Sequence, residues 1–548
     1  MKKITICLLF VMIASQFSCK KFLSITPIDK LTGNNYYQSA TDIESNITDM
    51  YGQLFDKYVQ TNTAGGTGEF RSGEVIPAAS GQGTRIVRPD VALVGGHTKR
   101  INNSGISSGF QPIIGSSVVN DRYLLYAVAD RDPTTNIVNP MLFSNLTKWA
   151  EYYKVIQSAN ILVSKLQEGI PALTGDQTKK YIAEAKFIRN YSYFTMVRLY
   201  GDVVYYTTPF QKDPLPRENM VTVVQKCIAD LKSSKNDLPF VITDPSLRGV
   251  RASRGAVIGL LMNMNMWNAG FDPANKTAYY QETEALGAEI MASQAYRLIP
   301  LSDWATVAKG RSEESLFELF STINYNASSN PLAQVFKLAQ FGESFIHFPY
   351  RLPEYDNRTS PNVFTAEYMK KLYPDLQDNR LVAWFDDPFN QNAETFQMKK
   401  FAGNTFLDST NPLDNSIPDA SFLIMRYADA ILLRAEADAE LNLPDKAIEN
   451  LNIVRTRAIA TAYPVGAPAD AALKDAIFWE RAKELMGEGS RYFDLVRTKR
   501  IMSRNYTDNP LTADKFARGG WTWPIDASAL NNNPYMTLNA YWRGTGIE

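Results

Sequence analysis

Histidine and cysteine are the residues that this chain almost lacks. It has two histidines, His97 and His347, and three cysteines in 548 residues. So few histidines argue against histidine-based catalysis and against His-rich metal sites, and no cysteine pair has the spacing of a zinc site. There is also no P-loop, no dinucleotide-binding glycine pattern and no nucleophile elbow. The sequence therefore predicts a protein that is not an enzyme and that holds neither a cofactor nor a metal.

Net charge is also absent, because 57 basic residues balance 57 acidic ones. A neutral chain without a basic stripe lacks the electrostatic footprint of a nucleic-acid-binding protein. The many acidic residues prevent a pair of glycosidase carboxylates from being recognised in the sequence. Residues 386–394, DDPFNQNAE, offer oxygen ligands for calcium, but they lack the glycine and the spacing of an EF-hand loop.

The apolar run at the N-terminus, residues 4–14, is too short to cross a bilayer. It follows two lysines and precedes SQFSC, so residues 1–18 are typical of an export signal. Its end at Cys19 is similar to the lipobox of bacterial lipoproteins, which predicts acylation of Cys19 and a tether over residues 19–34. A plain secretory signal cut near Ser18 is the alternative. Cys227 would then be the only other cysteine in the mature chain, and its apolar helical surroundings indicate a core position.

Apolar residues recur at helical spacing in much of the chain. A first helix is expected over 35–57, where Ile43, Ile47 and Leu54 share one face. Three helical hairpins follow, and the segments that we expect to pair are 146–166 with 177–201, 218–238 with 253–270, and 422–442 with 447–459. Helix pairs of this length are typical of tetratricopeptide repeats, and neighbouring pairs must stack to bury their apolar faces. The sequence thus predicts a mainly α fold built as a tetratricopeptide-like superhelix.

Two regions interrupt the helical pattern. Residues 59–118 are rich in Gly, Ser, Thr and Asn, and we interpret them as a surface excursion with short pieces of structure inside an N-terminal region, 35–215. Middle hairpins occupy 216–299. The C-terminal region, 300–548, begins with strand-like SLFELF at 315–320 and with long aromatic loops.

The segment 488–500, EGSRYFDLVRTKR, concentrates charged and aromatic residues. Asp494 lies three residues from both Arg491 and Arg497, within side-chain reach on a helix. No nucleophile, histidine or phosphate-binding loop accompanies these residues. We therefore interpret the segment as an ion cluster that docks a helix, rather than as a catalytic site.

This segment also carries a resemblance to a known family. ERAKELMGEGSRYFDLVRTKR resembles the C-terminal signature of the SusD/RagB family of outer-membrane nutrient-binding lipoproteins. SCKKFLSITP, WAEYYKVIQSANILVSKL, RNYSYFTMVRLYGDVVYYTTP, YADAILLRAEADAELN and WPIDASALNNNP resemble further family segments in the same order, with Val204 in place of the usual proline. The similarity extends over nearly the whole chain.

The resemblance implies four tetratricopeptide-like hairpins on one side of the molecule and a loop-rich ligand-binding side. It further implies a non-catalytic lipoprotein of the outer membrane that faces the cell exterior. Its partner would be a TonB-dependent transporter of the SusC type, over which it sits as a lid, and its ligand an oligosaccharide, or a peptide in some members. An exported glycosidase and a general protein-binding repeat scaffold are the remaining alternatives.

Candidate ligand-binding residues follow from the chemistry of sugars. Pyranose rings stack on aromatic side chains, while their hydroxyls bond to a few placed polar groups. Loop aromatics are therefore better candidates than aromatics on helical stripes. The candidates in the excursion are Phe70, Arg71, His97, Arg100 and Phe110, and those in 322–356 are Tyr325, Phe345, His347, Phe348, Tyr350 and Tyr355. Trp149, Trp267, Trp479 and Trp523 are expected in the core, and Trp304 could lie in the core or at the ligand.

Overall fold

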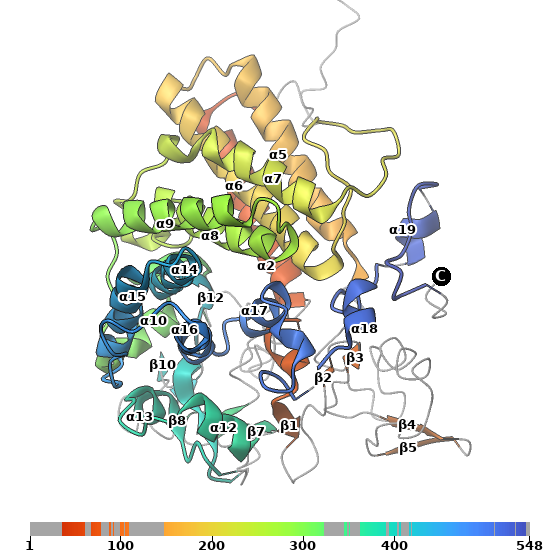
Figure 1. The fold of residues 1–548 in the computed structure, drawn as a ribbon. Helices are drawn as coiled ribbons and strands as arrows, with labels where there is room; N and C mark the ends of the chain where they lie inside the picture. Colours follow the sequence, from red (N-terminus) through yellow and green to blue (C-terminus); the bar gives the residue numbers. More distant parts are fainter. Residues whose placement is uncertain are drawn as a thin grey trace, which may run out of the picture.

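A computed structural model of the chain shows a body of stacked helices with small two-stranded sheets along one side (Figure 1). The mainly α prediction is confirmed. The structure describes residues 36–60, 67–77, 87–88, 91–92, 99–102, 105–108, 147–322, 345–347, 350, 362–390, 394–402, 405–406, 416–417, 419–508, 510–525, 527–531 and 533–543.

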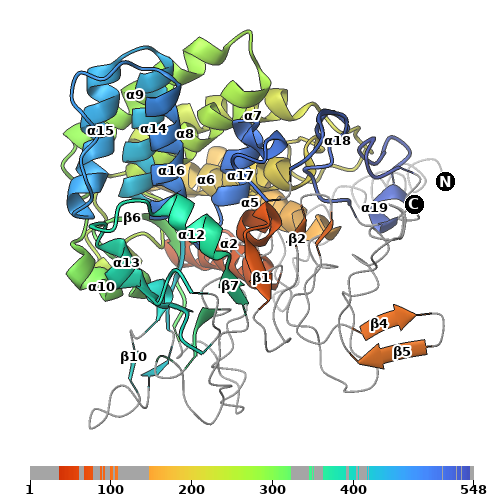
Figure 2. The same ribbon diagram turned by 60° about the horizontal axis from the view of Figure 1, so that its bottom comes forward.

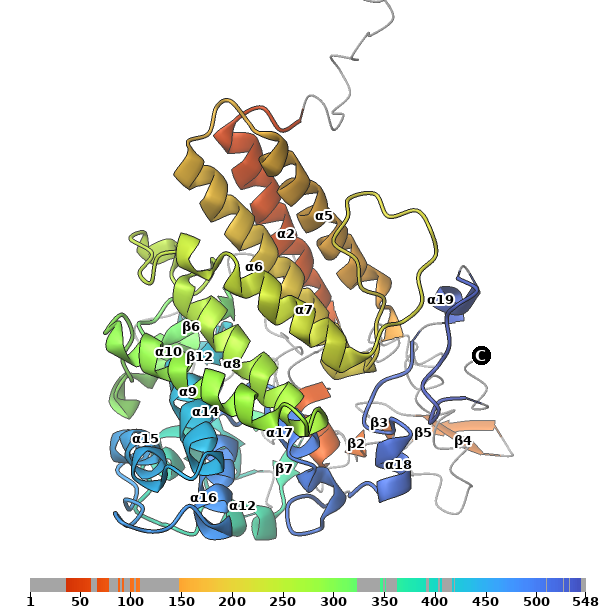
Figure 3. The ribbon, with the colours of Figure 1, turned by 45° about the horizontal axis from the view of Figure 1, so that its top comes forward.

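The N-terminal layer contains four helices that lie side by side in Figure 3: α2 (Ala40–Gln60), α5 (Ala150–Glu168), α6 (Gly175–Tyr200) and α7 (Met220–Lys232). The predicted hairpin α5–α6 is present. Helix α6 begins at a capping box, in which Thr174 and Gln177 each accept a hydrogen bond from the other's backbone N–H. Cys227 on α7 is fully buried, as predicted.

The second layer begins with α8 (Arg254–Phe271) and α9 (Lys276–Ala292), which pack as a hairpin. The sequence predicted the partner of α8 to be α7, which does contact it, but α9 was missed. The buried face of α9 includes Thr283 and Gly287, so its apolar pattern is weak. The remaining helices of this layer are α14 (Tyr427–Glu440), α15 (Pro444–Arg457), α16 (Ala471–Glu484) and α17 (Arg491–Arg497).

Strand β6 (Ser315–Leu319) confirms the strand expected in SLFELF and pairs antiparallel with β12 (Phe422–Arg426). The prediction of helix from residue 422 onward is wrong over these five residues. FLIMR is buried on both faces of the strand, and a short continuous apolar run fits a buried strand as well as a buried helix. Helix α14 begins directly after the strand.

The other sheets are two-stranded and antiparallel. They are β1 (Val75–Pro77) with β7 (Asn362–Phe364), β2 (Val87–Arg88) with β3 (Val91–Ala92), β4 (Lys99–Asn102) with β5 (Gly105–Ser108), β8 (Phe385–Asp386) with β9 (Gln397–Met398), and β10 (Thr405–Phe406) with β11 (Ser416–Ile417). Short helices complete the fold: α10 (Trp304–Lys309), α12 (Ala366–Leu372), α13 (Arg380–Trp384), α18 (Ala513–Ala517) and α19 (Ala527–Asn531). Figure 2 shows β4 and β5 away from the helical layers, near the end of the molecule that carries α18 and α19.

Part of the excursion lies in the core instead of on the surface. Residues 67–69 and 71–75 are buried, which corrects the expectation for this stretch. The guanidinium of Arg71 lies 4.4 Å from the ring centre of Tyr492 and 4.5 Å from that of Trp523, and it donates a hydrogen bond to the carbonyl of Trp521 at 2.9 Å. Cation–π contacts and a carbonyl thus satisfy a buried charge, so Arg71 is a structural residue and not a ligand contact.

The tryptophans divide between the core and its edge. Trp149, Trp267 and Trp523 are buried as predicted, whereas Trp479 is only partly buried. Trp304 also lies in the core, where its indole N–H donates to the carbonyl of Lys400 at 2.7 Å.

Four charged residues of 488–500, Glu488, Arg491, Asp494 and Arg497, form buried ion pairs, in line with the predicted ion cluster. Asp494 accepts hydrogen bonds from Arg497 at 2.8 Å and from Arg481 at 3.0 Å. Arg491, however, pairs with Glu74 at 3.0 Å rather than with Asp494. The partner lies far away in the sequence, so helical spacing could not reveal it.

A larger buried network surrounds Glu484 and Glu488. Arg426 is fully buried and donates to both of these carboxylates and to Glu314. The fully buried Arg380 adds pairs with Glu484, Glu480 and Asp378. Burial alone would raise the pKa of Glu480, but the nearby charges, that of Arg380 above all, outweigh it and lower the pKa to about 2. Nearby arginines likewise lower the pKa of Glu484 and Glu488, so these three glutamates are ionised structural groups.

Replacing Arg426 with methionine would remove a cationic partner from the buried carboxylates of Glu314, Glu484 and Glu488. We expect Arg426→Met to lower the free energy of unfolding by about 3–5 kcal/mol, measured by urea denaturation. The control is Arg297→Met, because Arg297 pairs with Glu313 on the surface with 64% and 45% of the two side chains exposed. That change should cost less than about 1 kcal/mol. Equal effects of the two substitutions would contradict the structural role of the network.

Two helical glycines provide a test of helix packing. A Cβ atom at Gly270 on α8 would lie 2.1 Å from the carbonyl oxygen of Arg497, which shows how closely α17 approaches α8. Gly270→Ala should therefore destabilise the protein by about 1–3 kcal/mol in thermal or urea unfolding. Gly52→Ala on α2 is the matched control, since nothing lies within 4 Å of its Cβ position. It should stabilise by about 0.5–1 kcal/mol through helix propensity.

Candidate functional site

Most of the ligand-binding candidates from the sequence lie outside the described residues. These are His97, Phe110, Tyr325, Phe348 and Tyr355, together with the side chains of Phe70 and Arg100. The backbone of Phe70 belongs to a short 3-10 turn, and that of Arg100 to β4. Their roles at a ligand stay predictions.

Phe345 and His347 lie in the core, which corrects the prediction for these two residues. Phe345 is 0% exposed, and its ring stacks on Phe364 with 4.9 Å between the ring centres. His347 is 5% exposed, and its backbone N–H donates to the side chain of Gln397 at 2.9 Å. The segment folds onto strands β7 and β9, so its rings fill the space beneath them and cannot stack on a sugar.

Tyr350 keeps part of its surface exposed and so remains compatible with ligand contact. The Nζ atom of Lys399 lies 5.8 Å from its ring centre, and the same amine pairs with Asp386 at 2.8 Å. Burial, and then the charge of Asp386, raise the pKa of the Tyr350 phenol. The phenol is therefore neutral at physiological pH and able to donate a hydrogen bond.

An open groove of about 540 Å³ lies between the turn after α6 and the C-terminal segment around α18. Its lining includes aromatic rings from Phe271, Phe516, Trp521 and Tyr535 and guanidinium groups from Arg217, Arg518 and Arg543, beside other polar and aliphatic residues such as Asp202, Asn539 and Leu538. Helices α18 and α19 lie on the same side of the helical body as β4 and β5 in all three views (Figures 1–3). The elements that flank the groove therefore lie on the side of the helical body that carries β4 and β5.

Arg217 holds the two walls of the groove together. Its guanidinium donates to the carbonyls of Tyr200 and Asp202 at 2.8 and 2.7 Å, and to the side chain of Asn539 at 2.7 Å. Asn539 in turn donates to Tyr200 at 2.9 Å and to Thr522 at 2.8 Å. Because these bonds use N–H donors of Arg217, this residue fixes the shape of the groove. It is not the main polar contact that the groove offers to a ligand.

The exposed groups of the groove can contact a ligand. Phe516 stacks on Phe271 with 6.2 Å between ring centres and 3° between their planes, which fixes a flat apolar wall. Tyr535 is 58% exposed and Arg518 is 45% exposed at the side chain. A flat ring surface beside guanidinium and phenol donors suits a ring compound with hydroxyl groups.

The groove was missed in the sequence because its walls come from four separate segments. RLYGDV, the stretch 216–220, Phe271 and the stretch 516–543 have no common periodicity. A signal was present in the density of aromatic and arginine residues in FARGGWTWP and NAYWRG, but of these residues only Trp523 was given a role, as part of the core.

Within the described ranges, no group of three or more His, Cys, Asp or Glu side chains has the arrangement of a metal site. In the same part of the chain, no helix combines the length and apolar character needed to cross a bilayer.

Comparison with known proteins identifies the family. Residues 386–542 match the model of the SusD family, and residues 105–264 match a model described as starch-binding and associating with the outer membrane. The chain is similar to SusD-like protein P25 of Formosa agariphila, with 24% identity over 528 residues that cover 89% of this chain and 88% of that protein.

Comparison with solved structures identifies the same family. A SusD homolog from Bacteroides thetaiotaomicron is 30% identical and superposes with a TM-score of 0.74 over 93% of this chain and 100% of that one. A laminarin-binding SusD-like protein is 20% identical, with a TM-score of 0.62 and coverage of 92% and 99%. The chain therefore belongs to the SusD family and has the family's tetratricopeptide-like helical fold.

Proposed function

We propose that this protein captures oligosaccharides outside the cell and delivers them, uncleaved, to a TonB-dependent outer-membrane transporter of the SusC type. Acylation of Cys19 would anchor the chain in the outer membrane, since about 0.8 kcal/mol per buried methylene makes several acyl chains a firm anchor. Membership of the SusD family and the laminarin-binding relative support the glycan assignment.

The groove between α6 and α18 is the observation that carries the proposal. It combines a stacked phenylalanine wall, an exposed tyrosine and exposed guanidinium groups on the side of the excursion. A sugar ring could stack on the wall while its hydroxyls accept hydrogen bonds from Arg518 and Tyr535. Such small contacts supply modest energies, which corresponds to dissociation constants from about micromolar to about millimolar.

Peptide binding is the second candidate, and it rests on one feature. Among the described strands, β4 and β5 pair only with each other, so each presents an outer edge to which an extended peptide could add. The two ligands use different surfaces: a sugar would use the ring-lined groove, and a peptide the strand edge.

Calorimetry on the mature chain from residue 20 onward tests the function. We expect binding from a panel of oligosaccharides that begins with laminarin fragments, and no heat from a pool of mixed peptides. Binding of peptides alone would overturn the sugar assignment. Release of reducing ends from any of these glycans would contradict the non-catalytic role.

Groove variants test the location. Tyr535→Ala and Arg518→Gln should each weaken glycan binding about two- to tenfold, in line with about 0.5–1.5 kcal/mol for one aromatic or polar contact. Leu376→Ala is the control, because Leu376 is 74% exposed on the connection between α12 and α13, away from the groove. If all three variants keep the wild-type affinity, the ligand binds elsewhere.

A further inference from the structure

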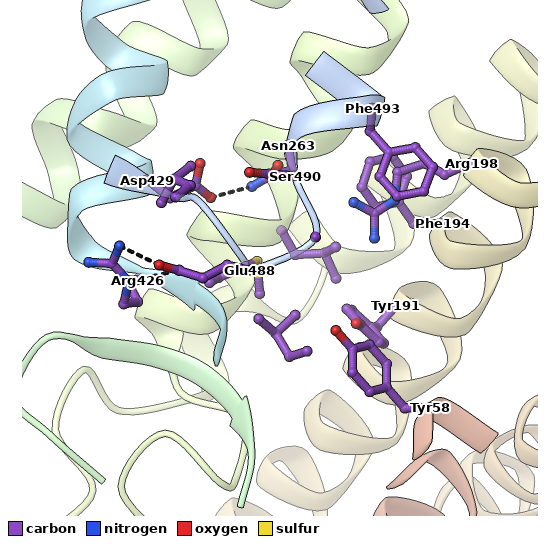
Figure 4. Close-up of a pocket in the computed structure, with 15 residues that line it drawn as sticks. Tyr58, Tyr191, Phe194, Arg198, Asn263, Arg426, Asp429, Glu488, Ser490 and Phe493 are labelled. Carbon is purple, nitrogen blue, oxygen red and sulfur yellow. Dashed lines mark hydrogen bonds and ion pairs between the residues drawn. The ribbon is translucent and has the colours of Figure 1, made fainter. Parts of the chain in front are cut away.

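A second cavity, of about 50 Å³, lies inside the body among α2, α6, α8, β12 and the turn before α17 (Figure 4). Its walls mix apolar side chains with tyrosine hydroxyls and four charged groups: Arg198, Arg426, Asp429 and Glu488. The groove described above shares none of these residues, so the cavity is a separate feature.

Three of the four charges are neutralised by direct partners. Glu488 pairs with Arg426 at 2.7 Å and with Lys400 at 2.6 Å. Asp429 pairs with Arg481 at 2.8 Å and accepts a hydrogen bond from Asn263 at 2.9 Å. These groups therefore need no ligand.

Arg198 differs from the other three. Its guanidinium lies between the rings of Phe194 and Phe493, 4.7 Å from each ring centre. It makes no hydrogen bond and no ion pair with any residue that the structure describes, and its Nε atom is buried without an acceptor. Burial lowers the pKa of this guanidinium, but an arginine stays charged at neutral pH. Among the described residues no carboxylate forms an ion pair with this guanidinium, although the charge of Asp429 acts on it from nearby.

The rings alone do not account for this arrangement. Cation–π contacts satisfy the faces of the guanidinium, whereas its N–H groups lie in the plane and still require acceptors. The Arg198 side chain is partly accessible, but its Nε atom is buried, and a buried N–H group without an acceptor is costly. Figure 4 shows the hydroxyl of Tyr191 turned toward the same space as the guanidinium. A phenol hydroxyl can donate to an anion, so Tyr191 adds a donor beside Arg198.

The size of the cavity limits the ligand. A single water molecule needs about 10–15 Å³ of cavity volume. A cavity of 50 Å³ therefore holds a few water-sized groups and no sugar ring. The carboxylates of Asp429 and Glu488 in the wall also disfavour a doubly charged anion.

We propose that this cavity binds one small monovalent anion, chloride or a short carboxylate such as formate, against the guanidinium of Arg198. The anion supplies the counter-charge where the N-terminal layer, through α2 and α6, meets α8, β12 and the turn before α17. It thereby stabilises the junction of the two helical layers. The site does not depend on glycan capture.

The test compares wild type with Arg198→Met on the mature chain from residue 20 onward. Methionine fills the space between the two rings without the charge, and replacing an unpaired buried charge with an apolar group should leave the fold intact. The midpoint of thermal unfolding is measured against sodium chloride, sodium formate and sodium sulfate at equal ionic strength. The wild-type midpoint should rise with the logarithm of chloride or formate concentration above the dissociation constant. The midpoint of Arg198→Met should not show this rise with chloride or formate concentration.

A control and a second readout complete the test. Arg254→Met removes an arginine that lies 4.8 Å from the ring of Phe240, outside the cavity, and should keep the wild-type anion dependence. Crystals grown with sodium bromide should show an anomalous peak beside Arg198 in wild type and none in Arg198→Met, or ordered formate if the site prefers carboxylates. The same salt dependence in wild type and Arg198→Met, or a cavity with water alone under both salts, would overturn the proposal.

Discussion

The buried carboxylate–guanidinium network around Glu484 and Glu488 is the constraint on which the rest of the structure depends. Arg426 reaches it from the end of β12, and Arg380 reaches it from α13. Each of these segments must be in place for the charges to be neutralised, since one missing partner leaves a charge in a dry interior. The network therefore fixes the relative positions of segments whose apolar contacts alone would tolerate small shifts.

Buried carboxylates also fix the stretch 67–75 to the helical body. Glu69 accepts a hydrogen bond from the backbone of Gly489 at 2.9 Å, and Glu74 pairs with Arg491. Burial raises the pKa of Glu69 to about 8, so at neutral pH this side chain is largely protonated and the close approach to Glu488 involves little repulsion. The described stretch 67–75 is thus attached to the helical body by specific polar contacts.

The sequence predicted the helical hairpins well and the ligand-binding residues poorly. Both outcomes follow from how far apart in the sequence the contacting residues lie. Helical hairpins such as α5–α6 are local, and the 3.6-residue period reveals them directly. The pairing of Arg491 with Glu74 joins distant segments, and no spacing rule reaches that far. Strand β12 was taken for helix because five buried residues have no period to measure, and α9 was missed because Thr283 and Gly287 occupy its buried face.

Ring-bearing loops were a reasonable guide to a sugar site, but in this protein many rings serve the interior. Phe345 joins the ring cluster beneath β7, and the rings of Tyr492 and Trp523 hold the charge of Arg71. The number of aromatic residues in a loop therefore cannot distinguish a loop that binds a ligand from one that fills the core. A ring belongs to the core when both of its faces contact a buried cation or another ring.

In the groove, the stacked pair Phe271 and Phe516 lies beside the exposed Tyr535, so apolar surface and polar donors meet at the solvent. That combination is what capture of a hydrated ring compound requires, and it arises only once the fold has brought four separate segments together.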